Sequence, residues 1–199
     1  YKPTPVAVAI DGLAVWVNKD NPIKELSMKQ VDAIFSKARA CGGPKDITTW
    51  GDLGLTGSWA DKPISLYGRN SASGTYAYFK EHVLSKGDYK DTVKEQPGSA
   101  AVVNGVANDE DGLGYFGYAY YAANKERLRA IAIQNGPDAK PVLPSPETIA
   151  DKSYKPLSRP LFIYVKNSAA RRPEVKQFLS FYIDKVDELA RQGGYDPPS

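Results

Sequence analysis

The stretch GRNSASGTYAYF, residues 68–79, brings together side chains that are well suited to bind an anion. It places Arg69, several hydroxyl groups and Gly74 between a short apolar run, PISLY, and a segment with helical spacing, YFKEHVL. The first N–H groups of a helix have no partner inside the helix, and the helix dipole is positive at that end. The stretch therefore predicts an anion site at the start of a helix.

Each member of this stretch has a definite role in such a site. If Ser73 or Thr75 caps the helix, the N–H groups around Gly74, Thr75 and Tyr76 point outward, and the missing Cβ at Gly74 lets an oxyanion reach the backbone. The two hydroxyl groups donate hydrogen bonds, and Arg69 offers a planar fork that matches a tetrahedral oxyanion. The same residues also fit a plain capped helix with Arg69 in water, so their spacing alone leaves both interpretations open.

The bulk composition is ordinary for a globular protein. With 199 residues, of which 42% are hydrophobic and 25% charged, the chain can form one large domain or two small lobes. No apolar run approaches the ~20 residues of a membrane helix, and no signal peptide opens the sequence, so we expect a cytosolic protein or the trimmed form of a secreted one. The net charge of +3 comes from scattered residues, which favours a solvated surface over nucleic-acid binding.

Cysteine and histidine, which often carry chemistry, occur once each. A single cysteine excludes an internal disulfide and a thiolate metal cluster, and Cys41 beside two glycines is expected in a loop, with a bond to a segment outside the chain as the alternative. No carboxylates lie at metal-ligand spacing around His82, which is expected on a helix surface rather than in a catalytic site. We therefore predict no metal and no organic cofactor.

Strand-like and helix-like segments alternate along the chain, which indicates an α/β architecture with sites at strand ends. Strands are expected at residues 5–17 with an interruption at Asp11-Gly12, at 64–67, within 111–117, at 128–133 and at 159–165. Ser27 and Gln30 form a capping box that starts a helix, and Ser99 is expected to cap another. Further helices are expected around 76–83 and from Arg172-Pro173 onward, and the proline-rich segment 135–149 is expected to be a surface connection.

Three motifs in order, GRNSASGTYAYF, GVANDEDGLGYFGYAYY and PLSRPLFIYVK, resemble the phosphate-binding subunit of bacterial high-affinity ABC phosphate importers. The similarity runs from AIDGLAVWVN near the start to GGYDPP at the end. It implies a periplasmic-binding-protein type II fold: two lobes of mixed β-sheets flanked by helices, with the ligand between them. The implied ranges are a hinge and first-lobe strand at 1–17, a second lobe carrying the anion-binding helix at 18–158, and a return strand with a first-lobe helix at 159–199.

In this family a segment of the form R-x-x-x-S-G-T binds phosphate. The resemblance carries this role over to Arg69, Ser73, Gly74 and Thr75, with Ser71 as an accessory candidate. Many members place an acid between the arginine and the serine, where it holds the guanidinium, whereas this chain has NSA there. The resemblance therefore does not fix the orientation of the Arg69 guanidinium.

The resemblance also implies that part of the ligand set lies outside this chain. Full-length members begin with a further segment that carries hydroxyl and backbone donors and an aspartate that accepts the proton of hydrogen phosphate. We therefore expect a fragment with an incomplete first lobe, for which the missing N-terminal segment is a partner. With the donors but not that acceptor, the chain is expected to bind tetrahedral anions weakly and to discriminate little between phosphate and sulfate.

The function implied by the resemblance is capture of inorganic phosphate in the periplasmic or extracellular space, with lipid anchoring of the parent left open, and delivery to the membrane subunits of an ABC permease. Two alternatives keep the fold: a binding protein for another oxyanion such as sulfate or molybdate, and a phosphate scavenger or sensor without transport. An enzyme with Ser73 as nucleophile is disfavoured for two reasons. No residue pattern points to a base that could activate the serine, and SASGT is not the G-x-S-x-G turn of a hydrolase.

Overall fold

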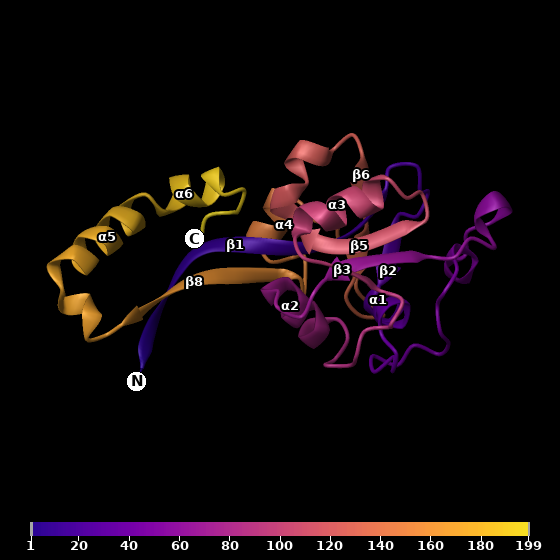
Figure 1. Cartoon of the computed structure of the whole chain (residues 1–199), viewed down its shortest axis with the longest axis horizontal. Helices are drawn as coiled ribbons and strands as arrows, with labels where there is room; N and C mark the ends of the chain where they lie inside the picture. Colours follow the sequence, from indigo (N-terminus) through magenta and orange to yellow (C-terminus); the bar gives the residue numbers. More distant parts are fainter. Residues whose placement is uncertain (1, 199) are drawn as a thin grey trace.

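Strand β1, Pro3–Asn18, connects two parts of the molecule in the computed structural model, which describes residues 2–198 (Figure 1). Its first half pairs antiparallel with β8, Ser158–Lys166, as far as Gly12. Its second half pairs antiparallel with β5, Gly112–Gly117, from Leu13 onward. The interruption expected at Asp11-Gly12 is thus a change of pairing partner within one continuous strand.

The main sheet is mixed and has the order β4-β3-β5-β1-β6, with β8 also paired to β1. Parallel pairs join β3, Ser65–Arg69, to β4, Lys94–Gln96, and to β5. β6, Leu128–Ala130, lies antiparallel to β1, whereas β7, Ala132–Gln134, pairs with β2, Glu25–Ser27, in a separate parallel sheet. The single strand expected at 128–133 is therefore two strands that belong to different sheets.

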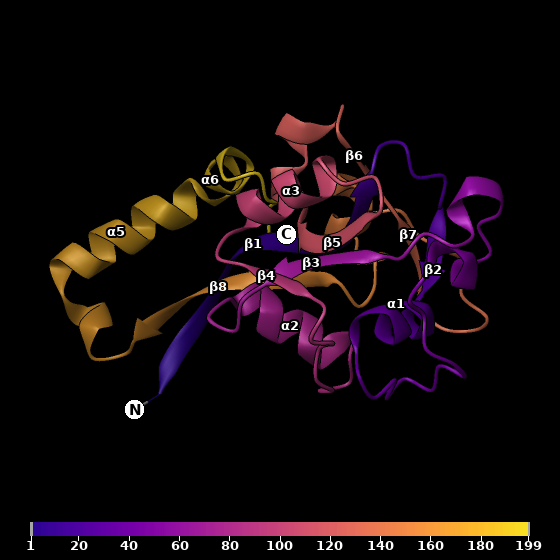
Figure 2. The ribbon, with the colours of Figure 1, turned by 45° about the vertical axis from the view of Figure 1, so that its right-hand side comes forward.

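Helices cover both faces of the main sheet (Figure 2). α3, Ser99–Ala107, lies on one face, and α1, Met28–Phe35, with α2, Gly74–His82, lies on the other. Successive side chains of β1 lie on opposite faces of the sheet. Leu13, Val15 and Val17 pack with α1 and α2, whereas Ala14 and Trp16 pack with α3. The uninterrupted apolar run LAVWV is explained by burial on both sides.

One expected helix start differs in the structure, and one helix lies where none was expected. The capping box of Ser27 and Gln30 at the start of α1 is confirmed. The expectation that Ser99 caps a helix is wrong, because the cap of α3 is Gly98 and the Ser99 hydroxyl instead accepts a hydrogen bond from Arg69. The expectation that residues 135–149 form only a surface connection is wrong at the end of this segment. There Ser145 caps a short helix, α4, Pro146–Ala150.

The long helix expected after Arg172-Pro173 is two helices, α5, Pro173–Asp184, and α6, Val186–Gln192. The chain leaves helical geometry at Lys185, where φ is −108° and ψ is 10°. Short 3-10 turns complete the secondary structure at Trp50–Leu53, Gly57–Trp59, Tyr118–Tyr120, Ala122–Asn124 and Ala169–Arg171.

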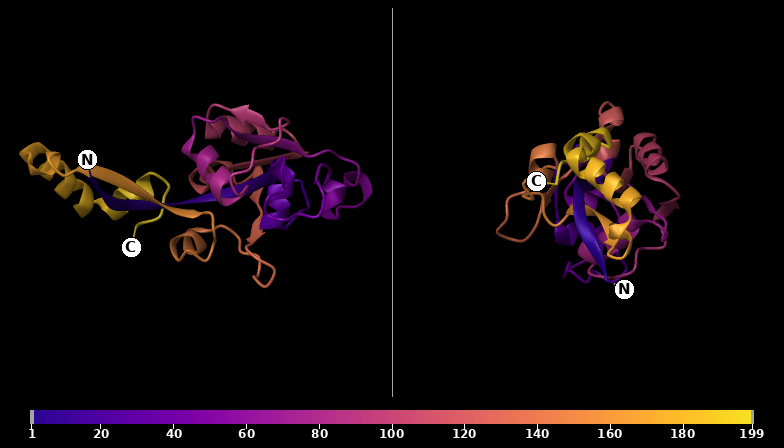
Figure 3. Two further views of the ribbon diagram at one scale, coloured as in Figure 1. Left: turned by 90° about the horizontal axis from the view of Figure 1, so that it is seen from below. Right: turned by 90° about the vertical axis from the view of Figure 1, so that its left-hand side faces the viewer.

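Residues 3–7 of β1, residues 161–166 of β8 and helix α5 form an arm that projects from the rest of the molecule (Figure 3). No residue of this arm is buried. We call residues 13–157, which contain nearly all of the buried core, the lobe. The junction between arm and lobe is closed by the C-terminal segment, where Asp196 and Ile10 exchange backbone hydrogen bonds.

Candidate anion-binding site

The carboxyl ends of β3 and β5 lie next to each other because the two strands are parallel neighbours. The segments that leave these ends enclose a pocket of about 180 Å³ at the junction of lobe and arm. Its charged lining residues are Asp11, Arg69 and Arg159, and its hydroxyl groups come from Thr75, Ser99, Tyr120 and Tyr195. Pockets for drug-sized ligands measure about 300–1,000 Å³, so this one suits a small ion.

The start of α2 lies beside this pocket and is capped by Ser73. The Ser73 hydroxyl oxygen accepts the N–H groups of Thr75 at 3.1 Å and Tyr76 at 3.4 Å. These two amides therefore already donate to the cap, which the sequence analysis did not take into account. The Gly74 N–H makes no hydrogen bond to another described residue. The helix start thus offers this amide together with the hydroxyl hydrogen of Ser73, whose oxygen is already occupied as an acceptor.

Arg69 is held by residues at the start of α3. Its Nη1 donates to the Ser99 hydroxyl at 3.1 Å, and its Nη2 donates to the Pro97 carbonyl at 3.3 Å. These contacts hold the guanidinium in place without a neighbouring acid in the segment NSA. The Arg69 Nε is buried and has no hydrogen-bond partner among the described residues.

Arg159 and Asp11, which the sequence reasoning missed, add a second cation and a carboxylate to the site. They are register partners on β8 and β1, and the Asp11 Oδ2 accepts from Arg159 Nη2 at 2.9 Å and Nε at 3.2 Å. The same Nη2 donates to the Thr75 hydroxyl at 3.3 Å. Charged residues inside the apolar strand sequences AIDGLAV and SRPLFIY were the signal that could have revealed the pair.

The environment of Asp11 is unusual for a carboxylate, because the residue is only 5% exposed. Burial raises the pKa of Asp11, and the Arg159 guanidinium together with the Gly12 amide offsets part of this effect. Asp11 Oδ1 has no hydrogen-bond partner of good geometry among the described residues. Burial also raises the pKa of the Tyr195 hydroxyl, which lines the same pocket.

The structure brings only some of the predicted phosphate-binding residues together at the small pocket. Arg69 and Thr75 line the pocket, and Ser73 and Gly74 adjoin it at the start of α2. Ser71 lines a different hollow, together with Tyr76, Lys80 and other residues of α2 and the loop after it. The accessory candidate is therefore not brought into the same pocket.

The single histidine and the single cysteine lie where the sequence indicated. His82 is exposed on α2, with its ring 4.1 Å from that of Tyr78. Cys41 lies in a loop, its Sγ donates to the Val83 carbonyl at 3.2 Å, and burial raises the pKa of its thiol. Within residues 2–198, no group of acidic, histidine or cysteine side chains is arranged to hold a metal ion, and no helix has the length and apolarity to cross a membrane.

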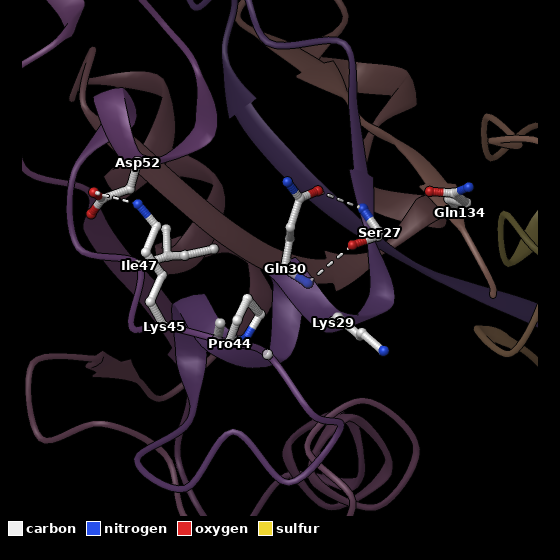
Figure 4. A pocket seen from close by; sticks show the side chains of 10 residues that line it. Ser27, Lys29, Gln30, Pro44, Lys45, Ile47, Asp52 and Gln134 are labelled. Carbon is white, nitrogen blue, oxygen red and sulfur yellow. Dashed lines mark hydrogen bonds and ion pairs between the residues drawn. The ribbon is translucent and has the colours of Figure 1, made fainter. Parts of the chain in front are cut away.

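A larger pocket of about 390 Å³ lies at the start of α1 (Figure 4). Several of its polar groups are already paired: Ser27 and Gln30 form the capping box, and Asp52 accepts N–H groups from Thr48 and Thr49. Lys45 lies 3.8 Å from the Asp52 carboxylate. This pocket therefore lacks the buried, unpartnered polar atoms that distinguish the smaller one.

Comparison with known proteins matches residues 2–186 to the family model of the PBP superfamily domain. The phosphate-binding protein PstS of Pseudomonas aeruginosa is 48% identical over 201 residues, which cover 99% of this chain and 61% of that protein. Protein SphX of Synechococcus elongatus is 35% identical, over 96% of this chain and 54% of its own length. The chain thus spans less than two thirds of the length of these relatives.

Comparison with solved structures also finds proteins described as phosphate-binding. A possible phosphate-binding protein from Planctomyces limnophilus matches with a TM-score of 0.78 and 34% identity, over 100% of this chain and 68% of that one. An ABC-type phosphate transport receptor from Vibrio cholerae matches in fold, with a TM-score of 0.74, 23% identity, and coverage of 98% and 73%. The α/β architecture with mixed sheets is therefore confirmed as that of periplasmic binding proteins, and the chain belongs to the PBP superfamily.

Proposed function

We propose that this chain binds inorganic phosphate in the pocket between the start of α2 and the β1–β8 pair. The observation that carries the proposal is the convergence of Arg69, Thr75 and Arg159 on one small pocket at the carboxyl ends of two parallel strands. Two guanidinium groups and one carboxylate give the lining a net charge of +1, which favours an anion. The names of the relatives, which are those of phosphate-binding proteins, support phosphate as the ligand.

The donors in the pocket explain how the anion would be held. The buried Arg69 Nε, the Gly74 amide and the Thr75 hydroxyl each have a hydrogen to donate, and charge-assisted bonds of this kind contribute roughly 1.5–3 kcal/mol each. A guanidinium fixed by Ser99 and Pro97 is already oriented before the ligand arrives, so little conformational freedom is lost on binding. No step of bond breaking is required, and we propose a binding protein rather than an enzyme.

Calorimetric titration of the chain with phosphate tests the proposal. Arg69→Ala is expected to weaken binding roughly 10- to 100-fold, because it removes at least one charge-assisted hydrogen bond. Arg127→Ala is the matched control: Arg127 also has its guanidinium held by side-chain acceptors, Asn104 and Asn124, but does not line the pocket. Equal affinities for the wild type and the Arg69 variant would refute the proposal.

We further propose that the parent protein works outside the cytoplasm and passes phosphate to the membrane subunits of an ABC importer. In this account residues 18–158 form the second lobe, residues 1–17 and 159–199 belong to the hinge and first lobe, and the segment that the longer relatives possess completes the ligand set. Closure of the lobes would require that the anion contact both. The test is phosphate uptake by cells that lack their own binding subunit and receive the full-length parent protein, with the Arg69→Ala variant as control.

A further inference from the structure

We propose that Arg159 is a positioning residue for the anion: it holds the hydroxyl group of Thr75 in a donating orientation, and Tyr78 holds Arg159 in turn. The inference rests on the proposed function and deepens it, since one of the two arginines in the pocket lining then acts through a neighbour. Arg159 belongs to β8 and Thr75 to α2, so the base of the arm would determine how well the lobe holds its ligand.

The nitrogen atoms of the Arg159 guanidinium all donate to acceptors within the protein. Nε and Nη2 donate to Oδ2 of Asp11 at 3.2 and 2.9 Å. Nη2 also donates to the Thr75 hydroxyl at 3.3 Å, and Nη1 donates to the Gly74 carbonyl at 3.5 Å. An arginine whose donors are engaged in this way adds positive charge to the pocket, but it acts on an anion mainly through the groups that it holds.

The bond from Arg159 determines how the Thr75 hydroxyl can act. Because its oxygen accepts from Nη2, the hydroxyl hydrogen points away from the guanidinium, and no described residue accepts this hydrogen. Thr75 lines the pocket and is only 8% exposed, and its branched side chain has few alternative rotamers. A hydroxyl group that accepts from a charged donor is also polarised and donates more strongly. Arg159 therefore prepares Thr75 to donate to an oxyanion.

Tyr78 lies three residues after Thr75 on the same side of α2, which runs beside the start of β8 (Figure 1). The Arg159 Cζ lies 5.2 Å from the centre of the Tyr78 ring, which is a cation–π contact. The Tyr78 hydroxyl lies 2.9 Å from the Pro156 carbonyl and 3.4 Å from the Ser158 carbonyl, and it donates to both. Tyr78 thus fixes the side chain of Arg159 and also the backbone from which it extends.

A double-mutant cycle tests this role, with the affinity for phosphate measured by calorimetry near neutral pH. Arg159→Lys keeps a positive charge beside Asp11, but an ammonium group lacks the planar fork that holds Asp11 and Thr75 together. Thr75→Val removes the hydroxyl group and keeps the shape of the side chain. We expect Thr75→Val to weaken binding roughly 10- to 100-fold and Arg159→Lys roughly fivefold. In the Thr75→Val chain, Arg159→Lys should weaken binding less than about twofold further.

Tyr78→Phe provides a second test that leaves the Arg159 guanidinium unchanged. It keeps the ring under the guanidinium and removes the hydroxyl group that holds the start of β8. Phosphate binding should weaken about threefold, and again only in the chain that has the Thr75 hydroxyl. Thermal melting by circular dichroism shows whether each variant is folded. If Arg159→Lys does not fold, the cycle of Tyr78→Phe with Thr75→Val decides.

Each variant has a matched control outside the pocket. Arg127→Lys changes a guanidinium that donates to the side chains of Asn104 and Asn124. Tyr67→Phe removes a hydroxyl group that donates to the Asp109 carboxylate at 2.9 Å. Neither residue lines the pocket, so both variants should keep the affinity for phosphate within about twofold of the wild type.

The outcomes separate this inference from the proposed function. A direct ligand, or an ion pair that only stabilises the hinge, would weaken binding by the same factor with or without the Thr75 hydroxyl. Equal factors for Arg159→Lys in the two chains, or no effect of Arg159→Lys in either, would therefore overturn the positioning role, while phosphate binding stands. If the wild type does not bind phosphate, the proposed function and the inference both fail.

Discussion

The lobe and the arm use similar residues in opposite environments. In the lobe, Trp16, Trp50 and Tyr115 are completely buried, whereas in the arm Tyr164 is 64% and Phe181 60% exposed. The lobe has helices on both faces of its sheet, and the arm has one antiparallel strand pair and one helix. An apolar helical pattern therefore predicts a helix but does not reveal whether a second layer covers it.

This difference also explains how the pocket residues that belong to the lobe are held in place. Arg69 is the last residue of β3, and its backbone N–H donates to the hydroxyl of Tyr115 in the lobe core at 3.3 Å. α2, which carries Ser73 to Thr75 at its start, is anchored by Phe79. The site residues from the lobe thus depend on its core, while Arg159 reaches them from the base of the arm.

The largest expected effect is the loss of Phe79. Its ring is fully buried, stacks on Tyr115 at 4.1 Å and meets the edge of Phe35 at 5.3 Å. Phe79→Ala should lower the free energy of unfolding by about 3–5 kcal/mol, measured by urea denaturation. Phe181→Ala in the arm, the matched control, should change it by less than about 0.5 kcal/mol. Similar losses at the two positions would contradict the comparison of lobe and arm.

A smaller effect is expected at Gly68, where the lobe core meets the site. A Cβ there would lie 2.7 Å from Cε1 of the Tyr115 ring, so Gly68→Ala should lower the free energy of unfolding by about 1–3 kcal/mol and also weaken phosphate binding by displacing Arg69. At Gly74, in contrast, a Cβ would meet open space, and Gly74→Ala should leave the stability unchanged or slightly higher. Equal destabilisation by the two variants would show that the contact with Tyr115 is unimportant.

The sequence predicted the parts of this site that are local. Ser73 caps α2 and Arg69 precedes it because a short segment of chain determines both. The contributions of Asp11, Arg159 and Ser99 depend on strand register and on which helix follows which strand, and these are properties of the assembled sheet. Strand pairing is likewise a property of the assembled sheet. The sequence therefore indicated only an interruption at Asp11-Gly12, where β1 changes its pairing partner from β8 to β5.

The smallest effect is expected from a surface ion pair of the lobe. Lys90 Nζ lies 2.6 Å from Asp46 Oδ1, and this hydrogen bond lowers the pKa of Asp46 below its ordinary value of 3.8. A carboxyl whose pKa is lower in the folded state stabilises it above pH 3.8, and this contribution disappears as the pH falls through the folded-state pKa.

Asp46→Asn should therefore cost up to about 1 kcal/mol near neutral pH and nothing in strong acid, as measured by urea denaturation at both conditions. Asp184→Asn in the arm, whose carboxylate forms no ion pair with a described residue, should have no effect at either pH. A pH-independent loss for Asp46→Asn would argue against the ion pair.

A crystal structure of the chain grown in phosphate tests the central claim most directly. We predict a phosphate ion in the pocket, within hydrogen-bond distance of the Arg69 guanidinium, the Gly74 amide and the Thr75 hydroxyl. A structure in which these groups close on one another, or in which phosphate binds only elsewhere on the molecule, would contradict the account.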